Sequence, residues 1–109
     1  MLRPPGSTRD FNEEVARAIH ATLSEILGEH SLRALYGYLK DHYDIGSEEI
    51  PYRLPAVIRV LEEMFGAVGA TAIGSDVAKK LYGNLGLRFI ERSNHTLEDY
   101  LKDALKLLQ

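Results

Sequence analysis

The stretch of this sequence most similar to a catalytic element is GATAIGSD, residues 69–76. Its glycine spacing and its serine hydroxyl match a phosphate-binding loop, in which backbone N–H groups surround the phosphates. The lysine that would contact those phosphates is missing, and an amphipathic helical pattern precedes the stretch in place of a buried strand. We therefore expect close helix packing here and no nucleotide site.

Metal chemistry also lacks a supporting pattern. The chain has no cysteine, and its histidines form neither an HExxH motif nor a pair four residues apart. The densest group of candidate ligands comprises Asp41, His42, Asp44, Glu48 and Glu49. Its spacing does not match a calcium loop, so we interpret it as a solvated acidic corner. No serine lies in a nucleophile-elbow pattern, and we expect no catalytic residue, no cofactor and no metal.

Small residues recur with a period of four in the second half of the chain. Gly66, Ala70, Gly74 and Ala78 share one face of a helix, beside a bulky stripe that includes Ile73. Small side chains in a row let another helix approach closely. The row predicts either a packing face inside the domain or an interaction surface for a second copy of the chain. On the second interpretation, Gly74→Leu would convert a dimer to a monomer.

Length and charge limit the class of protein. A chain of 109 residues suffices for one domain, and a net charge of -3 with interspersed signs gives no general attraction to nucleic acid. No signal peptide and no membrane-spanning run is evident. We expect a cytoplasmic protein that does not enter a membrane.

Hydrophobic periodicity predicts the elements that position these residues. Residues 1–9 are rich in Pro, Gly, Ser and Thr and predict a tail, so that the single domain covers residues 10–109. Apolar residues then recur at helical spacing in five segments, which are residues 10–28, 30–43, 55–65, 66–85 and 96–108. Prolines rule out one regular helix over 47–54, and LRFIER predicts an extended connector. The sequence thus predicts an all-α bundle of about five helices.

The same periodicity predicts a core and a set of tyrosines at its edge. We expect burial of Leu35, Leu39, Ile58, Leu61, Val77 and Leu101. Tyrosine combines an apolar ring with a polar tip, which suits the edge of a core or the rim of a pocket. The tyrosines are Tyr36, Tyr38, Tyr43, Tyr52, Tyr82 and Tyr100.

A DNA-binding interpretation depends on the second and third helical segments. They can form the two helices of a helix-turn-helix, with Arg53 and Arg59 as the candidate DNA contacts. Glu62 and Glu63 would repel the phosphates, and the connection between the segments is longer than usual. DNA binding by a transcriptional regulator therefore remains the alternative.

The order of features resembles a known family. The stretch LYGYLKDHYDIGSEEIPYRLPAVIRVLEEMFG, the small-residue helix, KKLYGNLGLRF and TLEDYLKDAL follow one another as in the fifth class of Nitrosopumilus output domains. These are small helical domains of archaeal signalling proteins, and the resemblance covers roughly residues 11 to 106. It implies an output module, and no catalytic residues are assigned to the family.

Together these observations predict a non-enzymatic interaction module in archaeal signalling or regulation. Its expected partners are a second copy, giving a homodimer, or another signalling protein. A helical domain that binds a small ligand in a tyrosine-edged pocket is a further alternative.

Overall fold

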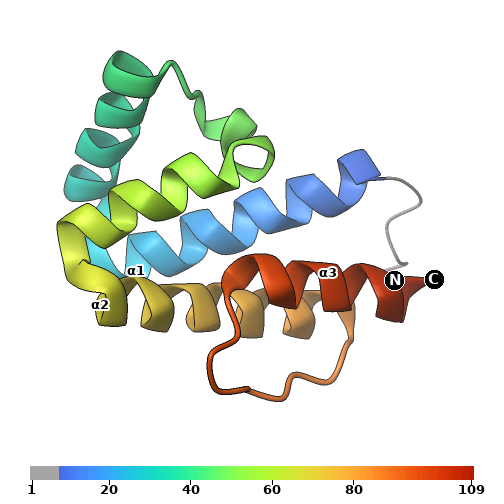
Figure 1. Ribbon diagram of the computed structural model, residues 1–109. Helices are drawn as coiled ribbons and strands as arrows, with labels where there is room; N and C mark the ends of the chain where they lie inside the picture. The colour runs from blue at the N-terminus through green and yellow to red at the C-terminus, as the bar shows by residue number, and fades with distance from the viewer. Residues whose placement is uncertain (1–7) are drawn as a thin grey trace.

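The computed structural model describes residues 8–109, which form helices joined by short connections (Figure 1). In chain order these are α1 (Thr8–Tyr43), the 3-10 helix η1 (Ser47–Tyr52), α2 (Leu54–Leu85) and α3 (Leu97–Leu108). Within this described part of the chain no strand is present, so the predicted all-α class is confirmed. Of the predicted tail, residues 1–7 lie outside the described residues, and α1 begins slightly before Asp10.

Two glycines divide the long helices into straight segments. Gly28 in α1 has φ 80° and ψ 162°, and Gly66 in α2 has φ 78° and ψ 167°. Residues with a Cβ avoid such positive φ values, whereas glycine adopts them without strain. The predicted ends at these glycines therefore correspond to sharp kinks. The expected count of about five helices is slightly off, because the helical assignment continues across both kinks.

The turn between α1 and α2 is held by buried isoleucines. Asp44 has a positive φ of 54°, and the chain then inserts Ile45 and Ile50 into the core, where they are 1% and 2% exposed. Between them, the Glu49 carboxylate accepts a hydrogen bond from the Gly46 N–H at 3.1 Å. Pro55 lies in the first turn of α2, where its missing N–H costs no hydrogen bond. The stretch that the prolines exclude from a regular α-helix is thus mostly the 3-10 helix.

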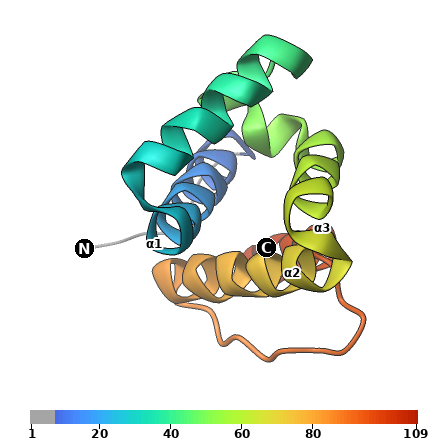
Figure 2. The same ribbon diagram turned by 90° about the vertical axis from the view of Figure 1, so that its left-hand side faces the viewer.

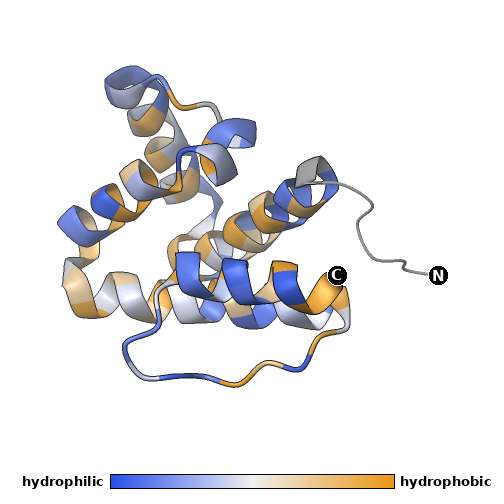
Figure 3. Cartoon of the chain, turned by 45° about the vertical axis from the view of Figure 1, so that its right-hand side comes forward, coloured by the Kyte–Doolittle hydropathy of each residue, from blue (hydrophilic) through white to orange (hydrophobic). Residues whose placement is uncertain are grey.

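The core lies where α1 crosses both halves of α2 and where α3 covers the second half. Figure 2 shows the two halves of α2 at a steep angle to each other, with α3 alongside the second half. Hydropathy follows this arrangement, since α3 presents a hydrophilic outer face in Figure 3. The apolar residues of its inner face pack on α2 and stabilise the bundle by removing apolar surface from water.

Most of the predicted core is confirmed. The buried members are Leu35, Leu39, Leu61 and Val77, which are 4%, 1%, 6% and 1% exposed. Ile58 and Leu101 are only partly buried, which corrects that part of the prediction. Ile58 lines a pocket that opens to solvent, and Leu101 lies beside the stripe that α3 buries through Leu97, Tyr100 and Ala104.

Candidate functional site

The row of small residues faces the inside of the molecule. Ala70, Gly74 and Ala78 are buried, and a Cβ built on Gly74 would lie 3.3 Å from the Cβ of Leu97. The row therefore lets the start of α3 pack closely on α2. Gly66 does not belong to this face, because it is exposed at the kink. The sequence left two interpretations open. For Ala70, Gly74 and Ala78, the structure shows a packing face inside the domain.

The pattern similar to a phosphate-binding loop lies inside the same helix. Residues 69–76 are α-helical throughout. Backbone N–H groups in a helix interior are directed to carbonyls one turn earlier, so they do not surround a phosphate. The glycines of this stretch serve helix packing, as expected from the sequence.

An apolar pocket lies next to the contact between Gly74 and Leu97. Its volume is about 90 Å³, and it is enclosed by all three α-helices. We name it the α3 pocket. Its apolar lining consists of Ile19, Leu23, Leu54, Val57, Ile58, Leu61, Ala70, Ile73, Gly74, Val77 and Leu97.

Polar side chains gather where the α3 pocket opens. They are Glu62 and Thr71 from α2, together with His95 and Thr96 before α3. Nε2 of His95 lies 2.8 Å from Oδ2 of Asp103, and this contact orients the ring, whose side chain is 21% exposed. The pocket thus has an apolar interior and a polar opening, an arrangement typical of sites that bind an apolar group.

A capping box fixes the side of the pocket formed by α3. The Thr96 hydroxyl accepts a hydrogen bond from the Asp99 N–H at 3.1 Å, and the Asp99 carboxylate accepts one from the Thr96 N–H at 3.0 Å. These bonds satisfy N–H groups that the first helical turn leaves without partners. These hydrogen bonds lower the pKa of Asp99 below its ordinary value. The bond to the Thr96 backbone has the larger effect, and the bond to the Thr96 side chain the smaller. The capping box thereby sets the position of Leu97 in the pocket.

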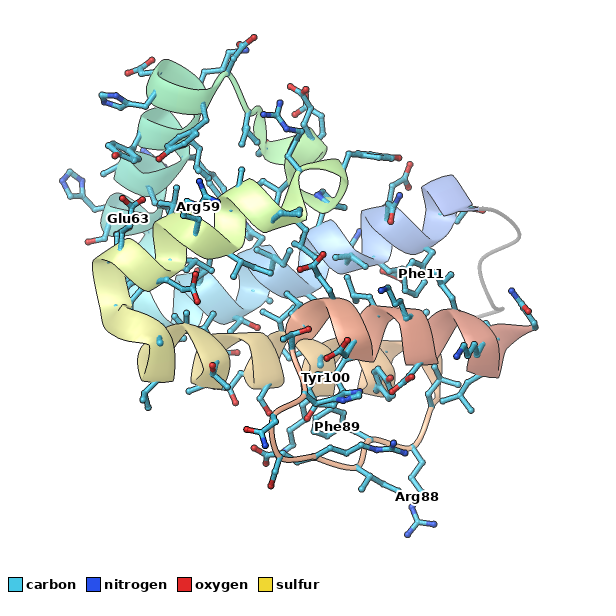
Figure 4. The ribbon with its side chains drawn as sticks, in the orientation of Figure 1. Phe11, Arg59, Glu63, Arg88, Phe89 and Tyr100 are labelled. Atoms are coloured by element: carbon cyan, nitrogen blue, oxygen red, sulfur yellow. The ribbon has the colours of Figure 1, made fainter. Side chains whose placement is uncertain are left out.

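Aromatic residues hold the connector between α2 and α3, residues 87–96. The Tyr100 hydroxyl accepts a hydrogen bond from the Arg92 N–H at 2.9 Å and donates one to the Arg92 carbonyl at 3.3 Å. The Tyr82 hydroxyl donates to the Tyr100 carbonyl at 2.7 Å, and burial raises the pKa of Tyr82. Phe89 packs between these rings, as Figure 4 shows for Phe89 and Tyr100. The connector is therefore held in a defined conformation although it has no regular secondary structure.

The tyrosines divide into three groups by burial, and one of these is the partly buried pair Tyr36 and Tyr43. Tyr82 and Tyr100 are 4% and 3% exposed and belong to the core. Tyr38 and Tyr52 are 43% and 60% exposed, and none of the six lines the α3 pocket. A ligand pocket edged by tyrosines therefore stays a prediction, and it would lie outside the α3 pocket.

The two arginines proposed as DNA contacts do not converge. Arg53 lies at the junction of η1 and α2, whereas Arg59 lies on α2 on the same face as Glu63 (Figure 4). Arg53 is the N-cap of α2, with a non-helical φ of -125° and ψ of 33°, whereas Arg59 lies within the helix. The pKa of nearby Tyr43 is raised, mainly by burial. The Glu63 carboxylate also raises this pKa, whereas Arg59 lowers it. DNA binding through Arg53 and Arg59 therefore stays a prediction.

The acidic corner forms ordinary surface contacts. Nζ of Lys40 lies 3.1 Å from Oδ1 of Asp44, and this exposed pair raises the pKa of Lys40. Among residues 8–109, no group of histidine, aspartate and glutamate side chains is arranged to hold a metal ion. No helix in that range is long and apolar enough to cross a bilayer.

Sequence reasoning missed the α3 pocket. Its lining residues have the same helical periodicity as ordinary core residues, so their pattern does not show that a space remains between them. The one available signal was the row of small residues, which marked where α3 approaches α2. Neither a family model, a curated protein nor a solved structure was found to match the chain.

Proposed function

We propose that this protein is a non-catalytic binding module, and that its α3 pocket accepts an aliphatic side chain of a partner protein. The observation that carries the proposal is the solvent-connected apolar cavity beside Leu97. Such concave apolar sites with a few polar groups at the opening are the usual form of binding sites.

The volume of the pocket favours a side chain over a larger ligand. An engineered apolar cavity of about 150 Å³ binds benzene, which has six carbon atoms. By that proportion, the pocket of about 90 Å³ holds roughly four carbon atoms. This is the size of a leucine or isoleucine side chain. Drug-sized ligands and cofactors occupy pockets of roughly 300 Å³ or more.

The opening suits the backbone of a bound protein segment. Thr71 and Glu62 offer a hydroxyl and a carboxylate close to the apolar interior. Such groups form hydrogen bonds with the N–H and C=O groups that flank an inserted side chain. The resemblance of the sequence to signalling output domains also supports a partner protein, acting in signalling or regulation.

The His95 ring supports binding over catalysis. Its two nitrogens lie near the carboxylates of Asp103 and Asp99, at 2.8 Å and 3.9 Å. Among the described residues, no serine or threonine hydroxyl hydrogen-bonds to this ring. A histidine that activates a nucleophile would contact such a hydroxyl. We therefore assign the ring a positioning role at the opening of the pocket.

The test is a peptide selection followed by binding measurements. A displayed peptide library is selected on the wild-type protein, and affinities of the enriched peptides are measured by fluorescence anisotropy. We expect a shared leucine, isoleucine or valine whose replacement by alanine weakens binding at least tenfold. Methyl NMR signals of Ile19, Val57 and Ile73 should shift on binding, because these residues line the pocket.

Matched variants assign the binding to the pocket. Ala70→Leu fills the interior, and Ala72→Leu adds the same side chain at an exposed position two residues further along α2. Peptide binding should be lost in the first variant and retained in the second. Ile58→Trp, which covers the opening at a partly buried position, replaces Ala70→Leu if that variant does not fold. Equal binding by all of these proteins would contradict the proposal.

A further inference from the structure

The connector presents a regular pattern of side chains on its outer side. Leu87 and Phe89 are partly buried, whereas Arg88, Ile90 and Arg92 are exposed. Successive side chains of an extended chain point to opposite sides, which matches the alternation from Leu87 to Ile90, and the exposed Glu91 then separates Ile90 from Arg92. In Figure 4, Phe89 points toward Tyr100 and Arg88 points away from the body of the molecule.

A hollow lies between the connector and α3. Its volume is about 490 Å³, within the usual range for binding sites. We name it the connector hollow. It is lined by Tyr82, Gly86, Leu87, Arg88, Ile90, Arg92, Tyr100, Asp103, Lys106 and Leu107.

The connector hollow concentrates positive charge without a partner. Among the described residues, Arg88, Arg92 and Lys106 take part in no ion pair. The one carboxylate in the lining belongs to Asp103, which is bound to His95 at 2.8 Å. The chain as a whole carries a net charge of -3, so this basic region stands out against an acidic surface.

Exposed aliphatic side chains accompany the cations. Ile90 is 54% exposed and Leu107 is 58% exposed, and both line the hollow. A site that combines cations with aliphatic surface is complementary to a segment that combines carboxylates with an aliphatic residue. We propose that the connector hollow binds an acidic, leucine- or isoleucine-containing segment of a partner protein. This surface is separate from the α3 pocket, so the proposal does not depend on the proposed function.

Two other classes of partner fit the geometry less well. Nucleic-acid bases stack on free aromatic faces, but Phe89 packs on Tyr82 and Tyr100 with ring centroids 5.4 Å and 5.2 Å apart. A membrane surface contacts side chains that protrude together, whereas Arg92 and Lys106 line a concave space and Arg88 points away from the body of the molecule. A protein segment can enter such a space and contact both kinds of side chain.

The clamp on the connector prepares the site for binding. The Tyr100 hydroxyl holds both backbone groups of Arg92, so the guanidinium groups project from a backbone that is already ordered. A preformed site loses less conformational entropy on binding than a mobile loop. The side chain of Arg92 is not used by the clamp, and it can therefore be altered without releasing the connector.

The test uses a fluorescein-labelled peptide of alternating glutamate and leucine, with glycine at both ends. We expect anisotropy to show saturable binding at low salt that weakens severalfold when ionic strength rises, because salt screens the charges. The double variant Arg88→Gln/Arg92→Gln should weaken binding about tenfold, since exposed pairs contribute modestly each. Arg33→Gln, at an exposed arginine of α1, is the matched control and should not change the affinity for the peptide.

Control peptides separate the two components of recognition. A lysine–leucine peptide should not bind, and a glutamate–serine peptide should bind more weakly than the glutamate–leucine peptide. Ile90→Ser should lower the affinity for the glutamate–leucine peptide. The affinity for the glutamate–serine peptide should stay unchanged. If the lysine–leucine and glutamate–serine peptides bind as tightly as the glutamate–leucine peptide, binding is not selective and the proposal is overturned.

Two further outcomes would contradict a protein segment as the ligand. The first is unchanged affinity in the Arg88→Gln/Arg92→Gln variant, with circular dichroism showing a folded protein. The second is binding to vesicles of phosphatidylserine and phosphatidylcholine, or to a single-stranded oligonucleotide, when the glutamate–leucine peptide fails to bind. In that case the basic region recognises phosphate groups on another class of partner.

Discussion

One hydroxyl group of Tyr100 holds both backbone hydrogen-bonding groups of Arg92, accepting from its N–H at 2.9 Å and donating to its carbonyl at 3.3 Å. This contact joins α3 to the middle of the connector. It satisfies the backbone in the way a neighbouring strand would, although no strand is present among residues 8–109. This side chain of α3 therefore contributes to the conformation of the connector, together with the packing of Phe89 on Tyr82 and Tyr100.

Removing that hydroxyl tests the clamp. Tyr100→Phe keeps the ring but leaves the Arg92 N–H without its partner, and we expect a loss of about 1 kcal/mol in the free energy of unfolding. Hydrogen exchange at the Arg92 amide should become faster. Tyr52→Phe, at a 60% exposed tyrosine, is the control and should change neither quantity. Unaltered exchange in Tyr100→Phe would show that other contacts hold the connector.

The kink in α1 gives a paired glycine test. Gly28→Ala should destabilise the protein by about 1 kcal/mol or more, because φ there is +80°. Gly37→Ala, in the interior of the same helix with no atom within 4 Å of the new Cβ, should stabilise it by about 0.5–1 kcal/mol. Urea denaturation measures both. A stabilising Gly28→Ala would mean that the kink is absent in solution.

The contact between Gly74 and Leu97 changes what is expected of Gly74→Leu. The new side chain would enter the packed contact between α2 and α3, where even a Cβ lies 3.3 Å from the Cβ of Leu97. We expect a loss of about 1–3 kcal/mol in the free energy of unfolding, with no change in oligomeric state. Gly83→Leu, where a Cβ meets nothing within 4 Å, is the control. Light scattering that showed a dimer becoming a monomer would favour the intermolecular interpretation instead.

A buried hydroxyl without a partner offers a stabilising substitution. Thr22 is 2% exposed, and its Oγ1 has no hydrogen-bond partner among residues 8–109. Thr22→Val has nearly the same shape and removes the desolvated hydroxyl, so we expect a gain on the order of 1 kcal/mol. Thermal and urea denaturation measure the gain. If Thr22→Val is less stable than the wild type, the hydroxyl forms a hydrogen bond in solution.

The capping box predicts a pH dependence. Folding lowers the pKa of Asp99, because the Thr96 N–H and hydroxyl stabilise its ionised form. The ionised carboxylate therefore contributes stability above the ordinary aspartate pKa of about 3.9, and this contribution is lost as pH falls through the lower pKa of the folded state. Asp99→Asn should be less stable than the wild type at pH 7, and the difference should narrow in urea denaturation at pH 3. A difference that stays constant with pH would contradict this assignment.

The sequence could predict the features that depend on neighbouring residues. Glycines end straight helical segments at Gly28 and Gly66, because a residue without a Cβ adopts φ near 80° with ψ near 165° without strain. The start of α3 is local in the same way, since the capping box of Thr96 and Asp99 forms within four residues. The extended nature of the connector was equally local.

Other features were decided by contacts between distant residues. The α3 pocket exists because α1, both halves of α2 and α3 meet without filling the space between them, and helical periodicity carries no information on that fit. Likewise, the small-residue row had two interpretations until Leu97 was placed over Gly74.

What the sequence by itself determined is the local structure of this protein: its helical segments, its kinks and its caps, because each depends on the backbone and side chains of a few adjacent residues. Only the tertiary structure decided which faces meet, leaving a pocket beside Leu97 and a basic hollow beside Tyr100. Those features follow from packing residues far apart in the chain, for which side-chain volume and crossing geometry must be known together.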